Sequence, residues 1–350
     1  MAYTTIKKPS DYFNTKVYTG NGTSQTLDMD NLGMLWMKNR TETSNHNLFD
    51  VVRGGYYTSD PGPNLRPNDT TAGHGSDITS AYGITFGSSS STIGSDGGGY
   101  NYNQNGKSYV GWQWRANGAG VANTDGTISS TVSANTTAGF SVVKFTATGA
   151  NLTVGHGLGV APKMIITKNL SITKDWSVYH SSLGAGKSIF LNTTAVADTD
   201  NSYWNNTAPT STTFSYGTWS GNNNGNEIIA YCFAEKQGYS KFGSYTGNGS
   251  TDGTFVYTGF KPAMVILKNT SITGNWQIMD NRRNTYNAVD TLLKPNDNIA
   301  DQTPSDAKDF LSNGFKLRNS AGEDNGSGNN LIYMAFAEEP LVGDNPATAR

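Results

Sequence analysis

The sequence predicts an all-β protein built from three tandem antiparallel β-sandwich domains. Glycine (41 residues) and asparagine (38 residues) are abundant, and both residue types favour turns over helix interiors. Only 15% of the residues are charged, too few for long helices with repeated ion pairs, whereas 11% are aromatic and suit half-buried strands. A third observation, an internal repeat of about a hundred residues, sets the number of domains.

The repeat is clearest between two fifteen-residue segments that lie 100 positions apart. Residues 162–176 (PKMIITKNLSITKDW) and 262–276 (PAMVILKNTSITGNW) share nine identical residues, where chance would give roughly one. Both copies close with similar strands, IIAYCFAE at 228–235 and LIYMAFAE at 331–338. A more divergent first copy contains YTGNG at 18–22, MLWMKN at 34–39 and YVGWQW at 109–114.

These copies set the predicted domain limits. We expect β-sandwich domains at residues 16–118, 140–239 and 240–340. Residues 119–139 are rich in Ser, Thr, Ala and Gly and read as a linker, while residues 1–15 and 341–350 read as short terminal tails. A lone cysteine, Cys232, allows no internal disulfide or zinc cluster, so stability has to come from burial and hydrogen bonding.

Within each copy the strands follow from the hydrophobic pattern. The runs MIIT at 164–167 and MVIL at 264–267 are short, apolar and bounded by Pro and Lys-Asn, as expected of strands buried on both faces. The segments WSVY at 176–179 and WQIM at 276–279 nearly alternate and predict the next antiparallel strand. Loops rich in Gly and Asn precede the last strand of each copy and predict hairpin turns, and residues 304–311 are the one candidate for a short helix.

Several residues recur at equivalent places and are best explained by the fold that the copies share. Met34, Met164 and Met264 open the buried strand, and Trp176 and Trp276 open the strand that follows, so we expect all five in the core. A Lys-Asn pair ends the buried strand in every copy, and the asparagine there most simply caps a turn through its own side chain.

The strongest repeated polar pattern is an aspartate three residues before an arginine. It occurs as Asp50 with Arg53 and as Asp280 with Arg283, while the middle copy has His180 at this place. A saccharide clamp is one interpretation. We favour the other, an ion pair that fixes the turn after a strand, because charged pairs that recur in duplicated domains usually hold a shared geometry.

Aromatic residues found in one copy only are the better candidates for a ligand site. Tyr203, Trp204 and Trp219 occur only in the middle copy, among Asn, Ser and Thr residues, and could stack on a sugar ring. The alternative is that they are half-buried loop aromatics without a ligand.

The sequence offers no pattern for enzyme, metal or cofactor chemistry. Neither a carboxylate pair nor a nucleophile beside a base can be located. The aspartates at 297–301 lack ordered calcium-ligand spacing, and the four histidines lack the spacing of metal ligands. We therefore expect no catalytic residue, no metal and no cofactor.

Charge and hydropathy also exclude two classes of partner. A net charge of −2 gives no basic surplus for nucleic acid, and no apolar run is long enough to enter a membrane. Lys7 and Lys8 are followed by no apolar block of the kind a signal peptide needs, so we expect the chain to be made in the cytoplasm without a signal peptide.

Four segments carry a resemblance to a known family: GYSKFGSYTGNGSTDG at 238–253, YTGFKP at 257–262, GHGLG at 155–159 and NHNLFD at 45–50. They resemble an uncharacterised family of virion structural proteins from bacteriophages of marine and freshwater bacteria, especially short-tailed phages of cyanobacteria. The resemblance covers residues 17–338. It implies concanavalin-like or SPRY-like sandwich domains in a particle protein of the kind often labelled a tail or tail-fibre protein.

The function expected from this resemblance is that of a virion surface protein. As a tail-fibre or appendage component it would bind other phage virion proteins and adhere to host-surface polysaccharide through many weak contacts. A homo-oligomer is expected, with a trimer the most plausible form by family analogy. The alternatives are a head or tail decoration protein with a purely structural role, and a glycan depolymerase.

Overall fold

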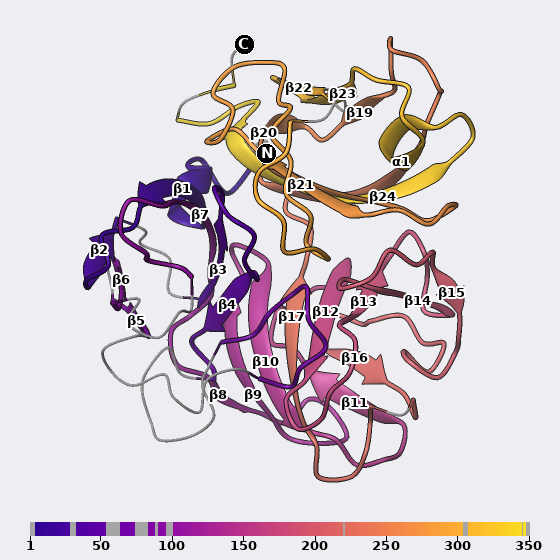
Figure 1. Ribbon diagram of the computed structural model, residues 1–350. Helices are drawn as coiled ribbons and strands as arrows, with labels where there is room; N and C mark the ends of the chain where they lie inside the picture. The colour runs from indigo at the N-terminus through magenta and orange to yellow at the C-terminus, as the bar shows by residue number, and fades with distance from the viewer. Residues whose placement is uncertain are drawn as a thin grey trace.

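The chain folds into an all-β structure with several antiparallel sheets (Figure 1). The computed structural model describes residues 4–28, 33–53, 64–73, 83–87, 90–95, 101–219, 221–303, 307–344 and 346–347. Three of its sheets contain the strands of the three sequence copies, which are called repeats 1, 2 and 3 below.

Repeat 1 has a four-stranded main sheet in the spatial order β1-β7-β3-β4. Its strands are β1 (Phe13–Thr19), β3 (Gly33–Asn39), β4 (Asn47–Asp50) and β7 (Ser108–Arg115). A smaller three-stranded sheet accompanies it and contains β2 (Gln25–Leu27), β5 (Ile84–Phe86) and β6 (Ser91–Ile93).

Repeat 2 has the same order of four strands, β10-β17-β12-β13, inside an eight-stranded sheet. These strands are β10 (Phe140–Thr146), β12 (Met164–Asn169), β13 (Ser177–His180) and β17 (Glu227–Phe233). The sheet is extended at its ends by β8 (Val121–Asn123), β9 (Ser130–Asn135), β14 (Lys187–Phe190) and β15 (Asp198–Thr199). A two-stranded sheet of β11 (Leu152–Gly155) and β16 (Thr213–Tyr216) lies beside it.

Repeat 3 again has four main strands, in the order β18-β24-β20-β21. They are β18 (Ser240–Thr246), β20 (Phe260–Asn269), β21 (Trp276–Asp280) and β24 (Asn330–Pro340). Its small sheet has the order β19-β23-β22 and contains β19 (Phe255–Tyr257), β22 (Lys308–Leu311) and β23 (Gly314–Leu317).

The register of the main sheets is the same in all three repeats. Met34 pairs with Trp114, Met164 pairs with Phe233, and Met264 pairs with Phe336. On its other side, each methionine pairs with the last residue of the following strand, which is Asp50, His180 or Asp280. A residue in one repeat therefore has a defined equivalent in the other two.

Each main sheet packs one face against its own small sheet. In repeat 2 this local core contains Ile165, Phe145 and Phe214, and in repeat 3 it contains Val265, Tyr333 and Phe315. Neighbouring residues alternate between the two faces of a strand, so Ile166 and Ile266 point the other way. They belong to a separate cluster.

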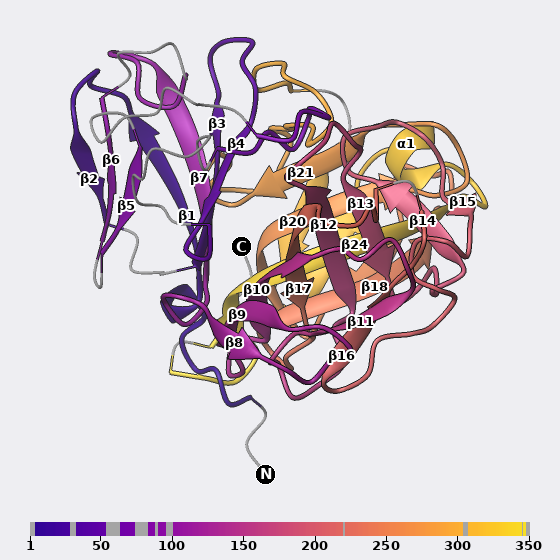
Figure 2. The same ribbon diagram turned by 90° about the horizontal axis from the view of Figure 1, so that it is seen from below.

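That separate cluster is a central core shared by all three repeats, and the three main sheets surround it (Figures 1 and 2). At its centre Trp114, Phe233 and Phe336, one from each repeat, form a triangle. Their ring centroids are 5.7 to 6.2 Å apart. Because the three rings are equivalent by register, the repeats are arranged with approximate threefold symmetry within one chain.

Three expectations about the connecting segments are corrected. Residues 119–139 are not a linker, because β8 and β9 extend the sheet of repeat 2. Residues 4–15 are not a free tail, because Ile6 is buried in the central core and β1 already begins at Phe13. A short helix was expected at residues 304–311, but residues 308–311 form β22. Residues 304–306 lie outside the described residues. A helical turn is found instead at α1 (Gly322–Asn325).

Candidate functional site

The two Asp-x-x-Arg pairs are ion pairs. They close the turn that follows β4 in repeat 1 and the turn that follows β21 in repeat 3. The Arg53 Nε donates to Asp50 Oδ2 at 2.5 Å, and the Arg283 Nε donates to Asp280 Oδ2 at 2.6 Å. The other carboxylate oxygen accepts the backbone N–H of the same arginine in both repeats. Both aspartates are fully buried, so neither pair is open to a saccharide.

These pairs also join one repeat to the next. The Tyr231 hydroxyl of repeat 2 donates to Asp50 of repeat 1 at 2.8 Å. The Trp112 Nε1 of repeat 1 donates to Asp280 of repeat 3 at 3.1 Å. Tyr231 and Trp112 are equivalent by register, so the same kind of contact recurs around the threefold axis.

The third junction explains why repeat 2 has histidine where the others have aspartate. The register equivalent of Trp112 and Tyr231 in repeat 3 is Met334, which has no proton to donate to a carboxylate. Here His180 Nε2 donates to the Tyr333 backbone oxygen at 3.2 Å, and its Nδ1 accepts the Ser182 N–H. Burial lowers the pKa of His180 to about 4, so the ring is neutral near pH 7.

A second set of contacts joins the same three pairs of repeats: repeat 2 to repeat 1, repeat 3 to repeat 2, and repeat 1 to repeat 3. Trp176 Nε1 donates to the Arg66 carbonyl oxygen, and Trp276 Nε1 donates to the Phe190 carbonyl oxygen, in each case in the preceding repeat. His46 replaces the tryptophan in repeat 1, and its Nε2 lies 3.0 Å from the Lys294 carbonyl oxygen of repeat 3. The two tryptophans are thus buried and also hold the repeats together.

The recurring Lys-Asn pairs are also part of the framework. Asn169 Oδ1 accepts the backbone N–H groups two and three residues further on, as do Asn39 and Asn269, which confirms the predicted turn caps. The preceding lysines are buried, and the ammonium groups of two of them reach carbonyl oxygens of the neighbouring repeat: Lys168 to Thr70 and Lys268 to Thr194. Burial lowers the pKa of Lys38, Lys168 and Lys268 to about 8.

This burial predicts a pH dependence of stability at alkaline pH. Between pH 8 and 10.5 these three lysines bind more protons in the unfolded chain than in the folded chain, so their contribution to the free energy of unfolding rises with pH. The variant Lys168→Met should lose about 1–2 kcal/mol of that rise. Urea unfolding at a series of pH values measures it, with the exposed Lys187→Met as the control. A slope that Lys168→Met leaves unchanged would contradict the burial of a charged lysine.

The aromatic residues predicted as a sugar platform in repeat 2 lie largely inside the protein. Trp204 and Trp219 are only 2% and 6% exposed and belong to the local core of repeat 2. Tyr203 is half-buried and stacks on Trp219, with ring centroids 4.8 Å apart. The expected platform is corrected accordingly, since the faces of both tryptophans are covered by packing against their own domain.

A pair of exposed aromatic side chains does lie elsewhere, on the edge strand β19. Phe255 and Tyr257 are 42% and 55% exposed and alternate with the buried Val256. Both therefore lie on the outer face of the small sheet of repeat 3, away from its local core. Phe255 pairs across the sheet with Lys316, which forms an ion pair with Asp252 at 2.7 Å. The result is an apolar strip with charged groups beside it, called the β19 face below.

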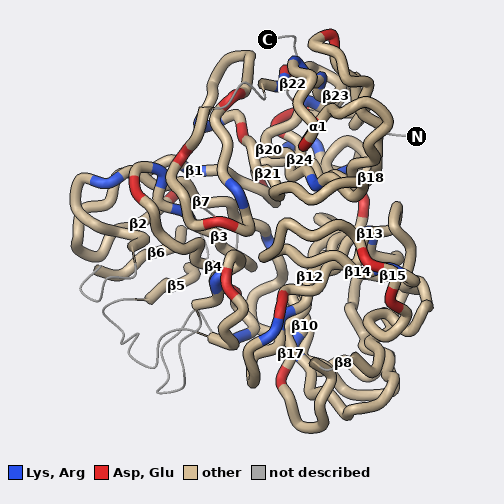
Figure 3. Tube along the Cα trace, turned by 45° about the vertical axis from the view of Figure 1, so that its right-hand side comes forward, with Lys and Arg blue, Asp and Glu red and all other residues tan. Residues whose placement is uncertain are grey.

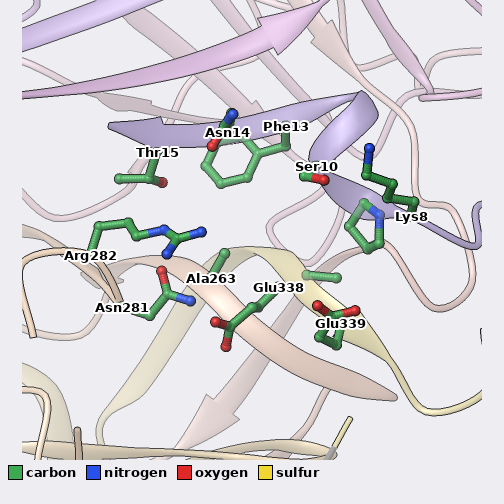
Figure 4. A pocket seen from close by; sticks show the side chains of 12 residues that line it. Lys8, Ser10, Phe13, Asn14, Thr15, Ala263, Asn281, Arg282, Glu338 and Glu339 are labelled. Atoms are coloured by element: carbon green, nitrogen blue, oxygen red, sulfur yellow. The ribbon is translucent and has the colours of Figure 1, made fainter. Parts of the chain in front are cut away.

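A cavity of about 120 Å³ lies between repeats 1 and 3 (Figure 4). Repeat 1 contributes Thr15 of β1, and repeat 3 contributes Asn281 and Arg282 after β21 and Glu339 of β24. Also lining it are Lys8, Pro9, Ser10, Phe13, Asn14, Ala263, Ala337 and Glu338. No residue of this cavity was predicted from the sequence to bind a ligand.

Within the described ranges, no group of three or more His, Cys, Asp and Glu side chains is arranged to hold a metal ion. Asp301, from the aspartate-rich loop, instead binds Arg40 at 2.7 Å and Arg283 at 3.0 Å. No helix among the described residues is long and apolar enough to cross a membrane. Lys and Arg residues are interspersed with Asp and Glu residues over the trace, and long uncharged stretches separate them (Figure 3).

Comparison with known proteins gives one match. The family described as a domain of unknown function (DUF7483) matches residues 8–340, which is nearly the whole chain. No curated protein and no solved structure matches it significantly.

Proposed function

For this chain, which belongs to the DUF7483 family, we propose the function of a bacteriophage virion surface protein that adheres to glycans of the host envelope. It is proposed to be a tail-fibre or appendage component that binds other virion proteins and assembles as a homotrimer. The resemblance of residues 17–338 to virion structural proteins supports the location on the particle. Each repeat, with its main and small sheets, is proposed to be one concanavalin-like or SPRY-like sandwich domain.

The observation that carries the adhesive role is the β19 face. Two aromatic rings on an edge strand, exposed in a chain that buries most of its aromatic residues, form an apolar surface that nothing in the fold requires. Flat aromatic rings can pack against the apolar face of a sugar ring while neighbouring polar groups bind its hydroxyls. Such contacts are weak singly and become strong when many copies on a particle act together.

Variants of the β19 face test this function. Purified protein is incubated with immobilised polysaccharide from cyanobacterial envelopes, and the retained fraction and any released oligosaccharides are measured. We expect retention without cleavage, and a loss of at least about tenfold in Phe255→Ser/Tyr257→Ser. Tyr286→Ser is the matched control, because Tyr286 is 81% exposed in a loop of the same repeat.

The other outcomes identify the alternatives. Cleavage of the polysaccharide would show a depolymerase, and neither retention nor cleavage would favour a decoration protein. Immunogold labelling of intact particles, with antibody to this chain, tests the proposed location independently. Particles that carry no label would contradict a protein of the virion surface.

A further inference from the structure

The cavity between repeats 1 and 3 contains two buried oxygen atoms without a partner. Thr15 and Asn281 are 5% and 3% exposed. Neither the Thr15 Oγ1 nor the Asn281 Oδ1 has a hydrogen-bond partner among the described residues. A buried polar atom without a partner destabilises the folded state, so two of them in one cavity indicate that a bound group supplies the missing hydrogen bonds.

The other two junctions show that the fold does not need these polar groups. The register equivalents of Thr15 are Val142 and Phe242. The equivalents of Asn281 are Val51 and Ser181, each of which donates its backbone N–H at the same place. At the junction of repeats 2 and 1 the equivalent pair is thus wholly apolar. Polar atoms at both places occur only where the cavity lies.

We propose that this cavity binds one sugar residue. The proposal deepens the proposed function, on which it rests, by adding a specific subsite to the adhesive surface. A hydroxyl group is the ligand chemistry that satisfies both oxygens, because it can donate to Asn281 Oδ1 and can donate to or accept from the Thr15 hydroxyl. A purely anionic group would instead place one acceptor against another at Asn281.

Charge and size agree with a neutral polyhydroxy ligand. The cavity is lined by two cationic residues, Lys8 and Arg282, and two anionic residues, Glu338 and Glu339, so its formal charges cancel. The side chains of Arg282 and Glu339 make no hydrogen bond or ion pair with another described residue, and both are available to bind hydroxyls. A volume of about 120 Å³ corresponds to about four water molecules at roughly 30 Å³ each, so the cavity takes one face of a single pyranose ring with its hydroxyls.

Figure 4 shows how the groups are distributed around the space. Thr15 of β1 faces Asn281 and Arg282 across it, and Glu338 and Glu339 of β24 lie on the same side as Asn281. A ring held between these two sides would bridge repeats 1 and 3. Binding would therefore depend on both repeats.

Saturation-transfer NMR with glucose, galactose, mannose and N-acetylglucosamine tests the site. We expect at least one of these sugars to bind, and Thr15→Val/Asn281→Val to weaken its binding by at least about tenfold. Because the two substitutions remove unpaired polar atoms, the double variant should unfold at the same or a higher urea concentration. Thr15→Ser keeps the hydroxyl and should keep the binding.

Thr193→Val is the matched control. It makes the same change at another buried hydroxyl without a partner among the described residues, and Thr193 does not line the cavity. Binding of none of the four sugars, or equal binding by the wild type and the double variant, would overturn the site and leave a cavity that holds water only.

The two proposals fail separately. If the wild type retains envelope polysaccharide but binds none of the four sugars, the sugar site is wrong and the adhesive function stands. If the wild type binds a monosaccharide in the cavity but retains no polysaccharide, the site stands and the adhesive function is wrong.

Discussion

Replacement of Phe336 by alanine is expected to lower the free energy of unfolding by about 3–5 kcal/mol. Phe336 belongs to the aromatic triangle, where its ring contacts Trp114 and Phe233, and it also stacks on Phe13 with centroids 5.0 Å apart. Because Phe336 belongs to repeat 3 and these partners belong to repeats 1 and 2, the loss should destabilise the whole chain in one cooperative transition.

Guanidinium unfolding followed by circular dichroism and by tryptophan fluorescence measures this effect. The two signals should change together in the wild type and in Phe336→Ala. The matched control is Phe255→Ala, an exposed phenylalanine of the same repeat, whose effect on stability should stay within about 0.5 kcal/mol. Separate transitions, of which Phe336→Ala moves only one, would show that the repeats fold independently.

Replacement of Asp280 by alanine is also expected to lower the free energy of unfolding by about 3–5 kcal/mol. The change leaves the guanidinium of Arg283 buried without its main partner and leaves the Trp112 Nε1 without an acceptor. Most of the cost is the penalty for a buried charge that keeps only its more distant carboxylate partner, Asp301 at 3.0 Å, not the strength of the lost ion pair itself.

A double variant separates these two contributions. Asp280→Ala/Arg283→Met removes both charges and should regain a large part of the lost stability. Asp301 would still bind Arg40 in this variant. The surface pair of Asp309 with Arg318 is the control, and Asp309→Ala should cost less than about 1 kcal/mol. Equal losses at the two aspartates would refute a special role for the buried pair.

The strands could be predicted from the sequence because the chain contains three versions of one pattern. The segment MIITKN was recognised as a strand with the help of its copy at 264–269, and the structure forms β12 and β20 there. The Ser- and Thr-rich stretch before residue 140 was misread because β9 is a strand of small polar residues, whose composition resembles that of a flexible linker.

The central core could not be predicted in the same way, although one signal was present. A run such as Met264 to Leu267 is apolar on both faces, and both faces must therefore be covered. One isolated sandwich covers only the inner face of its sheet. The pattern thus indicates that a second layer covers the other face of the sheet. It does not indicate that the other two repeats form that layer.

The polar residues between repeats show a similar limit. The sequence shows that His180 stands where the other copies have aspartate. The reason for the exchange needs the structure, which places Met334, a residue without a proton to donate, where the other junctions have Trp112 or Tyr231. Thr15 and Asn281 lie far apart in the sequence, and neither belongs to a recognisable motif. Only the circular order of the repeats brings them to one cavity and supplies the equivalents with which to compare them.

The placement of three equivalent sheets in one polypeptide has an evolutionary consequence. A ring of identical subunits has to accept every substitution three times, so a change that weakens one contact weakens all of them. Here each copy can mutate alone, and two unaltered junctions continue to hold the body together while the third acquires polar groups that would be too costly in triplicate.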